Sequence, residues 1–195
     1  MSATAPSDPR PLRIVAVNGS PSHPSRSRSL AEVALELLGG GDVIDLAELD
    51  PGALLALRSD PAVDAARDQV AAAQILVVAT PIYRATYTAL TKTIFDLQAQ
   101  DSLAGTVVVP IATGYGADHH LAIDHGLRPL VASLGGLTTS VGVYATKGDF
   151  TEDGSPSDGL LRTLTAAAAE ARTLAEALWG VDPSGSGAGA TGGAA

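Results

Sequence analysis

The stretch RIVAVNGSPSHPSRSRSL, residues 13–30, decides the fold, because it joins an apolar run to a hydroxyl-rich loop and then to an amphipathic helix. Residues 14–17 (IVAV) are all apolar, as in a parallel strand that helices cover on both faces. The sequence NGSP at residues 18–21 then ends the strand. A strand that leads through such a loop into a helix predicts an α/β protein with an anion site at the helix N-terminus.

The loop and the first helical turn supply groups that bind phosphate. Serine hydroxyls donate short hydrogen bonds, and arginine adds charge. Such donors suit the single terminal phosphate of a mononucleotide such as FMN, although a solvated loop would have the same composition. The residues concerned are Ser20, Ser22, Ser25, Arg26, Ser27, Arg28 and Ser29.

Signatures of other nucleotide and hydrolase sites are missing from this stretch. It has no GK[ST] ending, which argues against a Walker A loop, and no GxGxxG for a dinucleotide pyrophosphate. Ser20 does not lie in a GxSxG elbow, which argues against a serine hydrolase. The chain has no cysteine, so disulfides, thiol nucleophiles and thiolate metal sites are excluded.

Two more strand ends are expected beside this loop. Residues 75–79 run apolar into TPIY at 80–83, and residues 106–112 run apolar into TGYG at 113–116. In an open parallel sheet, ligands bind outside the carboxyl ends of the strands, at the point where the strand order reverses. The three strand ends are therefore expected to line one crevice.

Groups at these two strand ends are suited to hold a planar ring. Pro81 stiffens its turn and Tyr83 offers an aromatic face, while the N–H groups of Ile82 and Tyr83 are candidates to bond ring heteroatoms. Gly114 allows a ligand to approach the backbone closely. Ordinary packing of Tyr83 and a plain glycine turn are the simpler alternatives.

Strands and helices alternate along the chain, with intervals long enough for right-handed crossovers. We predict a flavodoxin-like α/β fold, a doubly wound five-stranded parallel sheet in the order 2-1-3-4-5 with helices on both faces. The expected strands are residues 13–18, 42–46, 75–79, 106–112 and 138–143. The expected helices are residues 27–39, 61–73, 86–98, 118–134 and 158–179.

Composition predicts one domain over residues 13–180, because 195 residues with 46% hydrophobic side chains suit a single core. Residues 1–12 are expected to be a flexible segment. Residues 181–195 (VDPSGSGAGATGGAA) are expected to be a disordered tail, since small residues cannot offset the entropy of ordering. The connection 145–158 either closes over the site or simply joins two elements.

The net negative charge of the chain disfavours some classes of binding partner. A formal net charge of −9 disfavours nonspecific binding to nucleic acid or to acidic membranes. No apolar run has the length of a signal-peptide core or a membrane span, so a cytoplasmic protein is expected. No metal site is expected either, because adjacent histidines on a helix point to different faces. The polar cluster in question is Asp118, His119, His120, Asp124 and His125.

Three motifs in order resemble the NAD(P)H-dependent FMN reductase family of two-component alkanesulfonate and methanesulfonate monooxygenase systems. They are GSPSHPSRS at 19–27, TPIYRATYTALTK at 80–92, and ATGYG at 112–116 followed by HLAIDHGLRPL at 120–130. The similarity covers residues 13–150 and is strongest to the methanesulfonate branch, where a comparable GVYA, here 142–145, follows.

The resemblance implies a flavoprotein that uses FMN with NADPH or NADH and supplies reduced flavin to a partner monooxygenase. A homodimer or homotetramer is expected. By position, the implied contacts to the FMN phosphate are Ser20, Ser25, Arg26 and Ser27. The implied contacts to the flavin ring are Pro81, Ile82, Tyr83, Thr113 and Gly114.

Two positions stand out against the family pattern. Tyr115 stands where the family usually has a second adjacent glycine, and its ring would shield the flavin or adjust substrate access. His125 lies where related sulfonate-system reductases carry an extra tyrosine or histidine in a helix at the subunit interface. That extra residue creates a π-type bulge in those relatives, and the sequence leaves open whether one forms here.

The expected reaction is hydride transfer from C4 of the reduced nicotinamide to N5 of FMN. Positioning of the two rings lowers the barrier, so no catalytic acid or base is predicted. The alternatives are an FMN-retaining reductase of quinones, azo dyes or metal oxyanions, and a flavodoxin-like electron carrier. The sequence does not separate NADPH from NADH. Arg84, just after TPIY, either attracts nucleotide phosphates or is an ordinary surface arginine.

Overall fold

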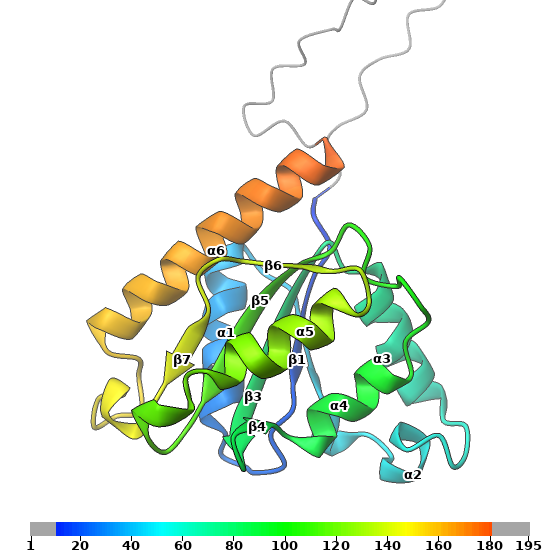
Figure 1. The fold of residues 1–195 in the computed structure, drawn as a ribbon, viewed down its shortest axis with the longest axis horizontal. Helices are drawn as coiled ribbons and strands as arrows, with labels where there is room; N and C mark the ends of the chain where they lie inside the picture. Colours follow the sequence, from blue (N-terminus) through cyan, green and yellow to red (C-terminus); the bar gives the residue numbers. More distant parts are fainter. Residues whose placement is uncertain (1–10, 181–195) are drawn as a thin grey trace, which may run out of the picture.

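The computed structural model describes residues 11–180, with the backbone alone for Ala117. The expected flexible segment 1–12 and tail 181–195 therefore lie outside the described residues, apart from Pro11 and Leu12. A mostly parallel sheet lies between two layers of helices (Figure 1). The strands are β1 (Ile14–Asn18), β2 (Asp42–Asp45), β3 (Ile75–Tyr83), β4 (Thr86–Tyr87), β5 (Val107–Thr113), β6 (Leu137–Thr138) and β7 (Val143–Ala145).

Helices cover both faces of this sheet. One hydrophobic core lies under α1 and α6, and the other lies under α2, α3, α4 and α5. The helices are α1 (Arg26–Leu38), α2 (Pro51–Leu54), α3 (Pro61–Ala72), α4 (Ala89–Asp96), α5 (Arg128–Ala132) and α6 (Asp158–Trp179). Short 3-10 turns are Leu46–Glu48, Ala117–His119 and Lys147–Asp149, and one π-helical turn is Ile123–Leu127.

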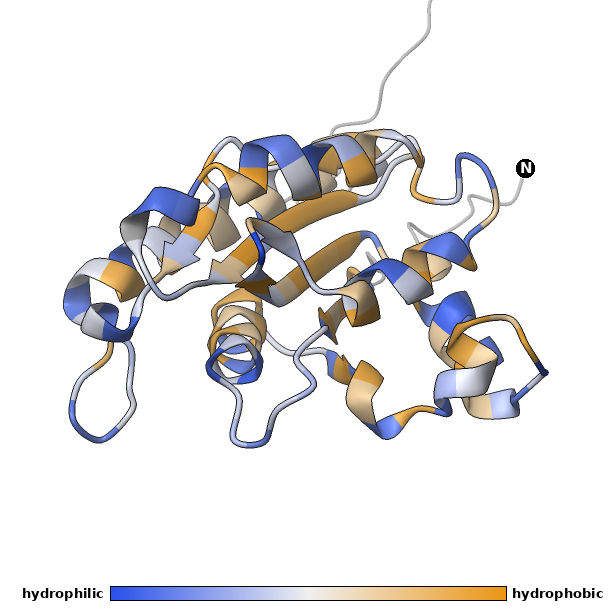
Figure 2. Ribbon diagram, turned by 60° about the horizontal axis from the view of Figure 1, so that its bottom comes forward, coloured by the Kyte–Doolittle hydropathy of each residue, from blue (hydrophilic) through white to orange (hydrophobic). Residues whose placement is uncertain are grey.

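The central strands are apolar throughout because each side of the sheet is buried. In β1, Val15 and Val17 belong to one core and Ala16 to the other. In β3, Leu76 and Val78 belong to the same core as Val15, and Val77 belongs to the same core as Ala16. Figure 2 shows these strands as the most hydrophobic layer of the molecule, between amphipathic helices. The period-2 alternation of side chains thus places every residue of the run in a core.

The predicted strand order is confirmed, whereas the number of strands differs from the prediction. The main path runs β2-β1-β3-β5-β6, which corresponds to 2-1-3-4-5. The sheet has seven strands rather than five, since β4 pairs antiparallel with β3 and since β6 and β7 share the fifth position beside β5.

The predicted fifth strand over residues 138–143 is wrong as one continuous strand, because the chain leaves β5 after Thr139, whose N–H still bonds the Val108 carbonyl at 3.0 Å, and pairs with β5 again only from Val143. Arg128 donates to the carbonyls of Thr139 (2.6 Å) and Ser140 (2.8 Å). Glu170 on α6 accepts the N–H groups of Ser140 (2.7 Å) and Val141 (3.2 Å). The interrupted backbone is thus satisfied by two side chains from opposite faces of the sheet.

Glu170 predicts a pH-dependent contribution to stability. Burial raises the pKa of this carboxyl, but the hydrogen bonds from Ser140 and Val141 and the charge of Arg128 outweigh burial and lower the pKa overall. A carboxyl with a lowered folded-state pKa stabilises the protein above its unfolded pKa and loses that contribution as the pH falls. Wild type is therefore expected to exceed Glu170→Gln by about 1 kcal/mol at neutral pH, in free energy of unfolding from urea titration. This difference should vanish in acid, and a difference independent of pH would contradict the assignment.

Two predicted helices also differ from the structure. The helix expected from residue 86 begins at Ala89, because Thr86 and Tyr87 pair with β3 across a two-residue turn. Arg84 and Ala85 form that turn with φ of 52° and 69°, the left-handed region in which glycine and asparagine are usual. The helix expected over 118–134 is broken into a 3-10 turn, a π turn and α5. His125 lies inside the π turn, so the bulge is present in this chain.

Candidate functional site

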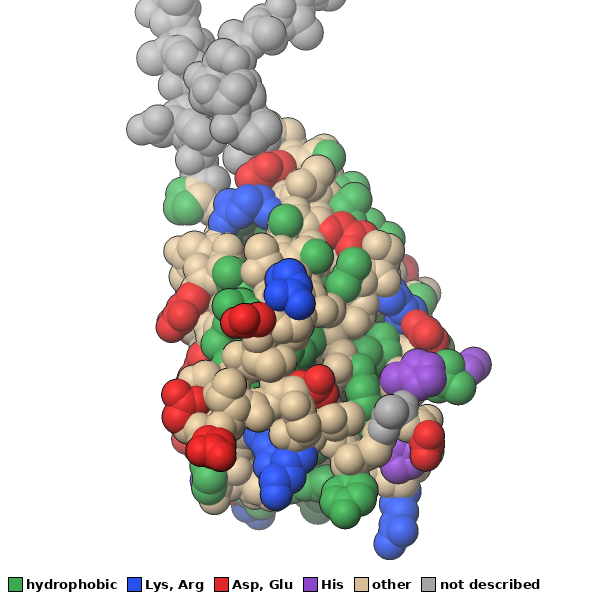
Figure 3. Space-filling view, turned by 90° about the vertical axis from the view of Figure 1, so that its left-hand side faces the viewer, with side chains coloured by type: hydrophobic (Ala, Val, Ile, Leu, Met, Phe, Trp, Pro, Cys, Tyr) green, Lys and Arg blue, Asp and Glu red, His purple; other side chains and the backbone are tan. Residues whose placement is uncertain are grey.

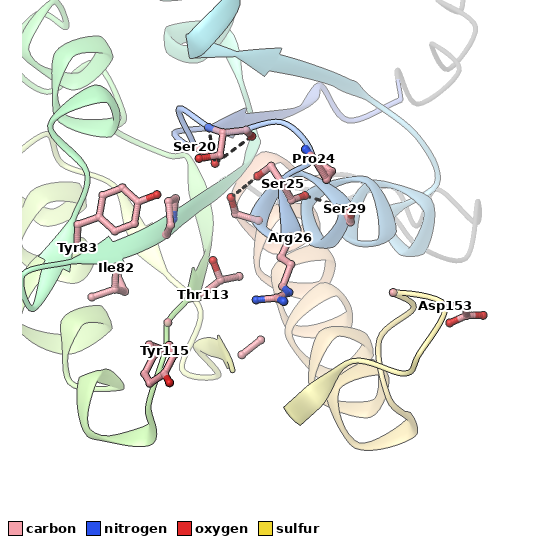
Figure 4. Close-up of a pocket in the computed structure, with 16 residues that line it drawn as sticks. Ser20, Pro24, Ser25, Arg26, Ser29, Ile82, Tyr83, Thr113, Tyr115 and Asp153 are labelled. Atoms are coloured by element: carbon pink, nitrogen blue, oxygen red, sulfur yellow. Dashed lines mark hydrogen bonds between the residues drawn. The ribbon is translucent and has the colours of Figure 1, made fainter. Parts of the chain in front are cut away.

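The carboxyl ends of β1, β3 and β5 open onto a cavity of about 740 Å³ (Figure 4). This volume lies within the usual range of small-molecule and cofactor pockets. All nine residues predicted to contact FMN lie in its wall. The complete lining is Ser20, Ser22, Pro24, Ser25, Arg26, Ser27, Ser29, Pro81, Ile82, Tyr83, Thr113, Gly114, Tyr115, Ala145, Asp153 and Gly154.

The start of α1 forms one end of the cavity. Ser25 caps the helix in an extended conformation, and its hydroxyl accepts the N–H of Arg28 at 3.2 Å. The N–H groups of Arg26 and Ser27, at the first two helical positions, have no intrahelical acceptor. These donors and the positive end of a 13-residue helix favour an anion at this end of the cavity.

The serine hydroxyls here form a directed network of their own. Ser27 donates its only hydroxyl proton to Asn18 Oδ1 at 2.9 Å, so the 2.9 Å contact between Ser25 and Ser27 must be donated by Ser25. Ser20 is likewise engaged, because its hydroxyl accepts the N–H of Ser22 at 3.2 Å. The sequence suggested that these hydroxyls would be open donors. In the structure they stiffen the loop, and the free N–H groups of α1 face the anion position.

The structure separates the roles of the two loop arginines. Arg28 turns away from the cavity and donates to Asp45 Oδ2 at 2.7 Å, while Asn18 Nδ2 donates to the same oxygen at 3.2 Å. Hydrogen bonds to Asp45 and then to Glu32 raise the pKa of Arg28. Arg28 thus holds the Asp45 carboxylate, which in turn orients Asn18 and, through it, the serine network. Of the two arginines predicted to supply charge to the anion, Arg26 lines the cavity and Arg28 does not.

Arg26 is the cation that faces the cavity. Its side chain is exposed and forms no ion pair within residues 11–180. Its guanidinium carbon lies 5.5 Å from the centroid of the Phe150 ring. In Figure 4 the guanidinium extends from the start of α1 into the cavity. An arginine without a carboxylate partner is available to a ligand anion.

Three threonines fix the β1 loop against the β3 loop. Thr88 donates to the carbonyl of Gly19 at 2.6 Å, and Thr91 donates to Thr80 Oγ1 at 2.8 Å. A Cβ atom on Gly19 would lie 1.9 Å from Thr91 Oγ1. Buried hydrogen bonds from threonine hydroxyls therefore hold two of the three predicted ligand-binding loops in contact. The close approach of these loops is possible because position 19 is glycine.

The other end of the cavity is flatter and less polar. Pro81 and Thr113 are register partners on adjacent strands, and Ile82 is buried beside them. Ile82 and Tyr83 pair with β4, and because successive N–H groups of a strand point to opposite sides, only one of the two faces β4. The N–H of Tyr83 pairs with Thr86 across the two-residue turn, and the N–H of Ile82 faces β5, where the parallel pairing of Pro81 with Thr113 uses it because proline has no N–H. The sequence-based expectation that these two amides are free is therefore wrong.

The β5 loop brings its backbone to the cavity edge. Gly114 donates its N–H to Ala145 O at 2.9 Å, and a Cβ there would lie 1.8 Å from Tyr144 Oη. Tyr144 donates to Gly116 O at 2.6 Å, and burial, with a smaller effect of Asp118, raises its pKa, which keeps the hydroxyl protonated. Tyr115 is 98% exposed at the rim, where its ring is free to move over a ligand.

Sequence reasoning did not identify four of the lining residues, namely Pro24, Ala145, Asp153 and Gly154. Three of them, Ala145, Asp153 and Gly154, belong to the connection 145–158, which thus lies against the cavity rather than away from it. Asp153 is held within its own loop by Thr151 and by the N–H of Ser155 at 3.1 Å, and these bonds lower its pKa. The only feature of the sequence that indicated this part of the cavity wall was the length of the connection after β7.

Other kinds of site would show in metal-ligand spacing, in a charged surface patch or in a membrane-spanning helix. Within residues 11–180, the only group with metal-ligand spacing is His23, Asp45 and Glu48, and Asp45 is already bound by Arg28. On the face in Figure 3, acidic side chains are interleaved with lysine and arginine, and histidines gather at one side. No helix in this part of the chain is both long and apolar enough to cross a membrane.

The sequence profile of NADPH-dependent FMN reductases matches residues 12–151. This chain belongs to that family. An FMN reductase (NADPH) of Escherichia coli K12 is 41% identical over 139 residues, 69% of this chain and 73% of that protein. The NADH-dependent FMN reductase SfnF of Pseudomonas fluorescens Pf0-1 is 36% identical over 85% of this chain and 92% of its own. Among family structures, an apo NADH:FMN oxidoreductase, EMOB, superposes with a TM-score of 0.77 at 35% identity, covering 89% of this chain and 92% of that one.

Proposed function

We propose that this chain is an NAD(P)H:FMN oxidoreductase that binds FMN in the cavity above β1, β3 and β5. One observation carries the proposal: a helix N-terminus and an unpaired arginine lie at one end of a cavity whose other end is a largely apolar shelf. A flavin mononucleotide has the matching polarity, with a dianionic phosphate at one end and a planar ring at the other. Family membership supports the same ligand.

The residues at each end fit the group they would hold. Arg26 and the first N–H groups of α1 would bind the phosphate, with Ser20, Ser25 and Ser27 shaping that seat. Pro81, Ile82 and Tyr83 would lie along one edge of the ring, with Thr113 and Gly114 along the other. Glycine at position 114 leaves room for Tyr144, whose Oη would lie 1.8 Å from a Cβ there.

The protein's part in the reaction is positioning. FMN, when bound, accepts a hydride at N5 from C4 of the nicotinamide. The threonine contacts fix the β1 and β3 loops, and the apolar side chains of Ile82 and Pro81 exclude water from the ring face. No side chain is assigned as an acid or base, because hydride transfer needs none. Tyr115, exposed at the rim, is placed to cover the second ring.

The fate of the reduced flavin is part of the proposal. Tyr83 and Tyr115 at the rim are 50% and 98% exposed, which suits a ligand that enters and leaves. We infer that reduced FMN is released to a flavin-dependent monooxygenase. We also propose a homo-oligomer and a cytoplasmic location, where reduced nicotinamides are available. The names of the relatives divide between NADPH and NADH, so both nucleotides are proposed as donors.

Steady-state oxidation of NADPH and of NADH by flavin-free protein, with and without added FMN, tests this function. Oxidation that requires added FMN and yields free reduced flavin is the expected result. Oxidation after which the added FMN stays bound to the protein would favour a reductase of quinones, azo dyes or metal oxyanions. No oxidation of either nucleotide would refute the proposal and favour an electron carrier.

A further inference from the structure

The guanidinium of Arg26 lies over the ring of Phe150. The separation of 5.5 Å from the guanidinium carbon to the ring centroid lies within the range of cation–π attraction, about 6 Å. Arg26 is exposed and reaches the cavity from the first position of α1. Without a neighbour, a long exposed side chain of this kind would lose considerable rotamer entropy on binding an anion.

Phe150 lies in a segment that is braced at both ends. Asp149, one residue before it, accepts the N–H (2.7 Å) and the hydroxyl (2.8 Å) of Thr146. The carbonyl of Asp149 accepts the N–H of Ser157 at 2.8 Å, and Phe150 itself forms a β-bridge with Pro156. The backbone of Phe150 is therefore fixed relative to β7 and to the start of α6, and its half-buried side chain packs against the core under α1 and α6.

The chemistry of the contact leaves Arg26 free to bind an anion. A carboxylate in this place would occupy the N–H groups of the guanidinium, whereas a benzene ring attracts the cation but has no lone pair to accept them. The segment has three acidic side chains: Asp149 accepts from Thr146, Asp153 is engaged by Thr151 and Ser155, and within residues 11–180 neither these two nor Glu152 forms an ion pair with Arg26. In Figure 4 the carboxylate of Asp153 points away from Arg26. The segment therefore offers Arg26 an aromatic support and not a competing charge.

We propose that Phe150 is a positioning residue that holds Arg26 over the phosphate seat, so that the connection after β7 takes part in recognising FMN. The inference rests on the proposed function, because the phosphate is that of the ligand proposed above. Phe150 acts through Arg26 and makes no assigned contact with the flavin ring.

Equilibrium binding of FMN and of riboflavin, which lacks the phosphate, tests this role in Phe150→Leu and Phe150→Tyr. Leucine keeps apolar bulk without a ring, and tyrosine keeps the ring. Phe150→Leu is expected to weaken FMN binding about two- to fivefold, with riboflavin binding unchanged and Phe150→Tyr close to wild type. In an Arg26→Ala background, Phe150→Leu should have no further effect.

Each other outcome has a definite meaning. Equal loss of FMN and riboflavin, or full additivity of Phe150→Leu with Arg26→Ala, would overturn the inference, because Phe150 would then shape the wall independently of the arginine. Unchanged FMN binding in Phe150→Leu, with a selective loss in Arg26→Ala, would overturn the inference and leave the proposed function intact. If Arg26→Ala fails to weaken FMN selectively, the phosphate seat of the proposed function fails together with the inference.

Discussion

Arg26→Ala is expected to weaken FMN binding by about ten- to a hundredfold, the range for a charge-assisted hydrogen bond that loses its cationic donor. Riboflavin binding should hardly change, because the missing contact is to phosphate. The thermal midpoint should stay within error, since the side chain is exposed and has no ion pair within residues 11–180. Fluorescence titration of both flavins, at two salt concentrations, measures the effect.

Arg162→Ala is the matched control for this substitution. Arg162 is an exposed arginine of α6 that does not line the FMN cavity, so its removal changes the net charge by the same amount without altering the wall of that cavity. Its FMN affinity should equal that of wild type. If both variants lose affinity equally, general electrostatics rather than a specific contact would explain the loss.

Gly19→Ala is expected to lower the free energy of unfolding by about 1–3 kcal/mol, as in other overpacked cores. The new Cβ would lie 1.9 Å from Thr91 Oγ1 and 3.1 Å from its Cα, so rotation of a side chain alone cannot relieve the clash. The β1 loop must then move away from α4 and lose the Thr88 bond to the Gly19 carbonyl. Weaker FMN binding should accompany the loss of stability, because the same loop forms the phosphate seat.

Gly116→Ala provides the comparison for Gly19→Ala. A Cβ on Gly116 meets nothing within 4 Å, and its φ is not in the left-handed region. Its free energy of unfolding in urea should stay within about 0.5 kcal/mol of wild type. Equal destabilisation by the two alanines would show that the close contact with Thr91 is not what requires glycine at position 19.

The sequence predicts the sheet well where strands are buried on both sides. The runs at β1, β3 and β5 are apolar throughout because both cores receive their side chains. The same logic fails for the fifth position, where Arg128 from α5 and Glu170 from α6 bind the backbone between β6 and β7 and the strand is interrupted. It also misses β4, since Arg84 and Ala85 lack the glycine or asparagine that marks a two-residue hairpin turn.

The sequence predicted which residues line the cavity better than it predicted the contacts that these residues make. All nine named residues reach one cavity because motifs that follow parallel strands meet at one sheet edge. Composition did not distinguish Arg26 from Arg28, and only the family resemblance selected Arg26, because the acceptor of Arg28, Asp45, lies on a neighbouring strand. It also gave no sign of the Phe150 contact, which joins residues far apart in the chain.

The most direct test of the central claim is anaerobic mixing of FMN and flavin-free protein with NADPH or NADH deuterated at the transferable C4 position. The absorbance of oxidised flavin reports the reaction in a single turnover. The proposed function predicts that FMN is reduced by at least one of the two nucleotides, that reduction is slower with the deuterated nucleotide, and that deuterium leaves the nicotinamide. Flavin that stays oxidised with both nucleotides would contradict it.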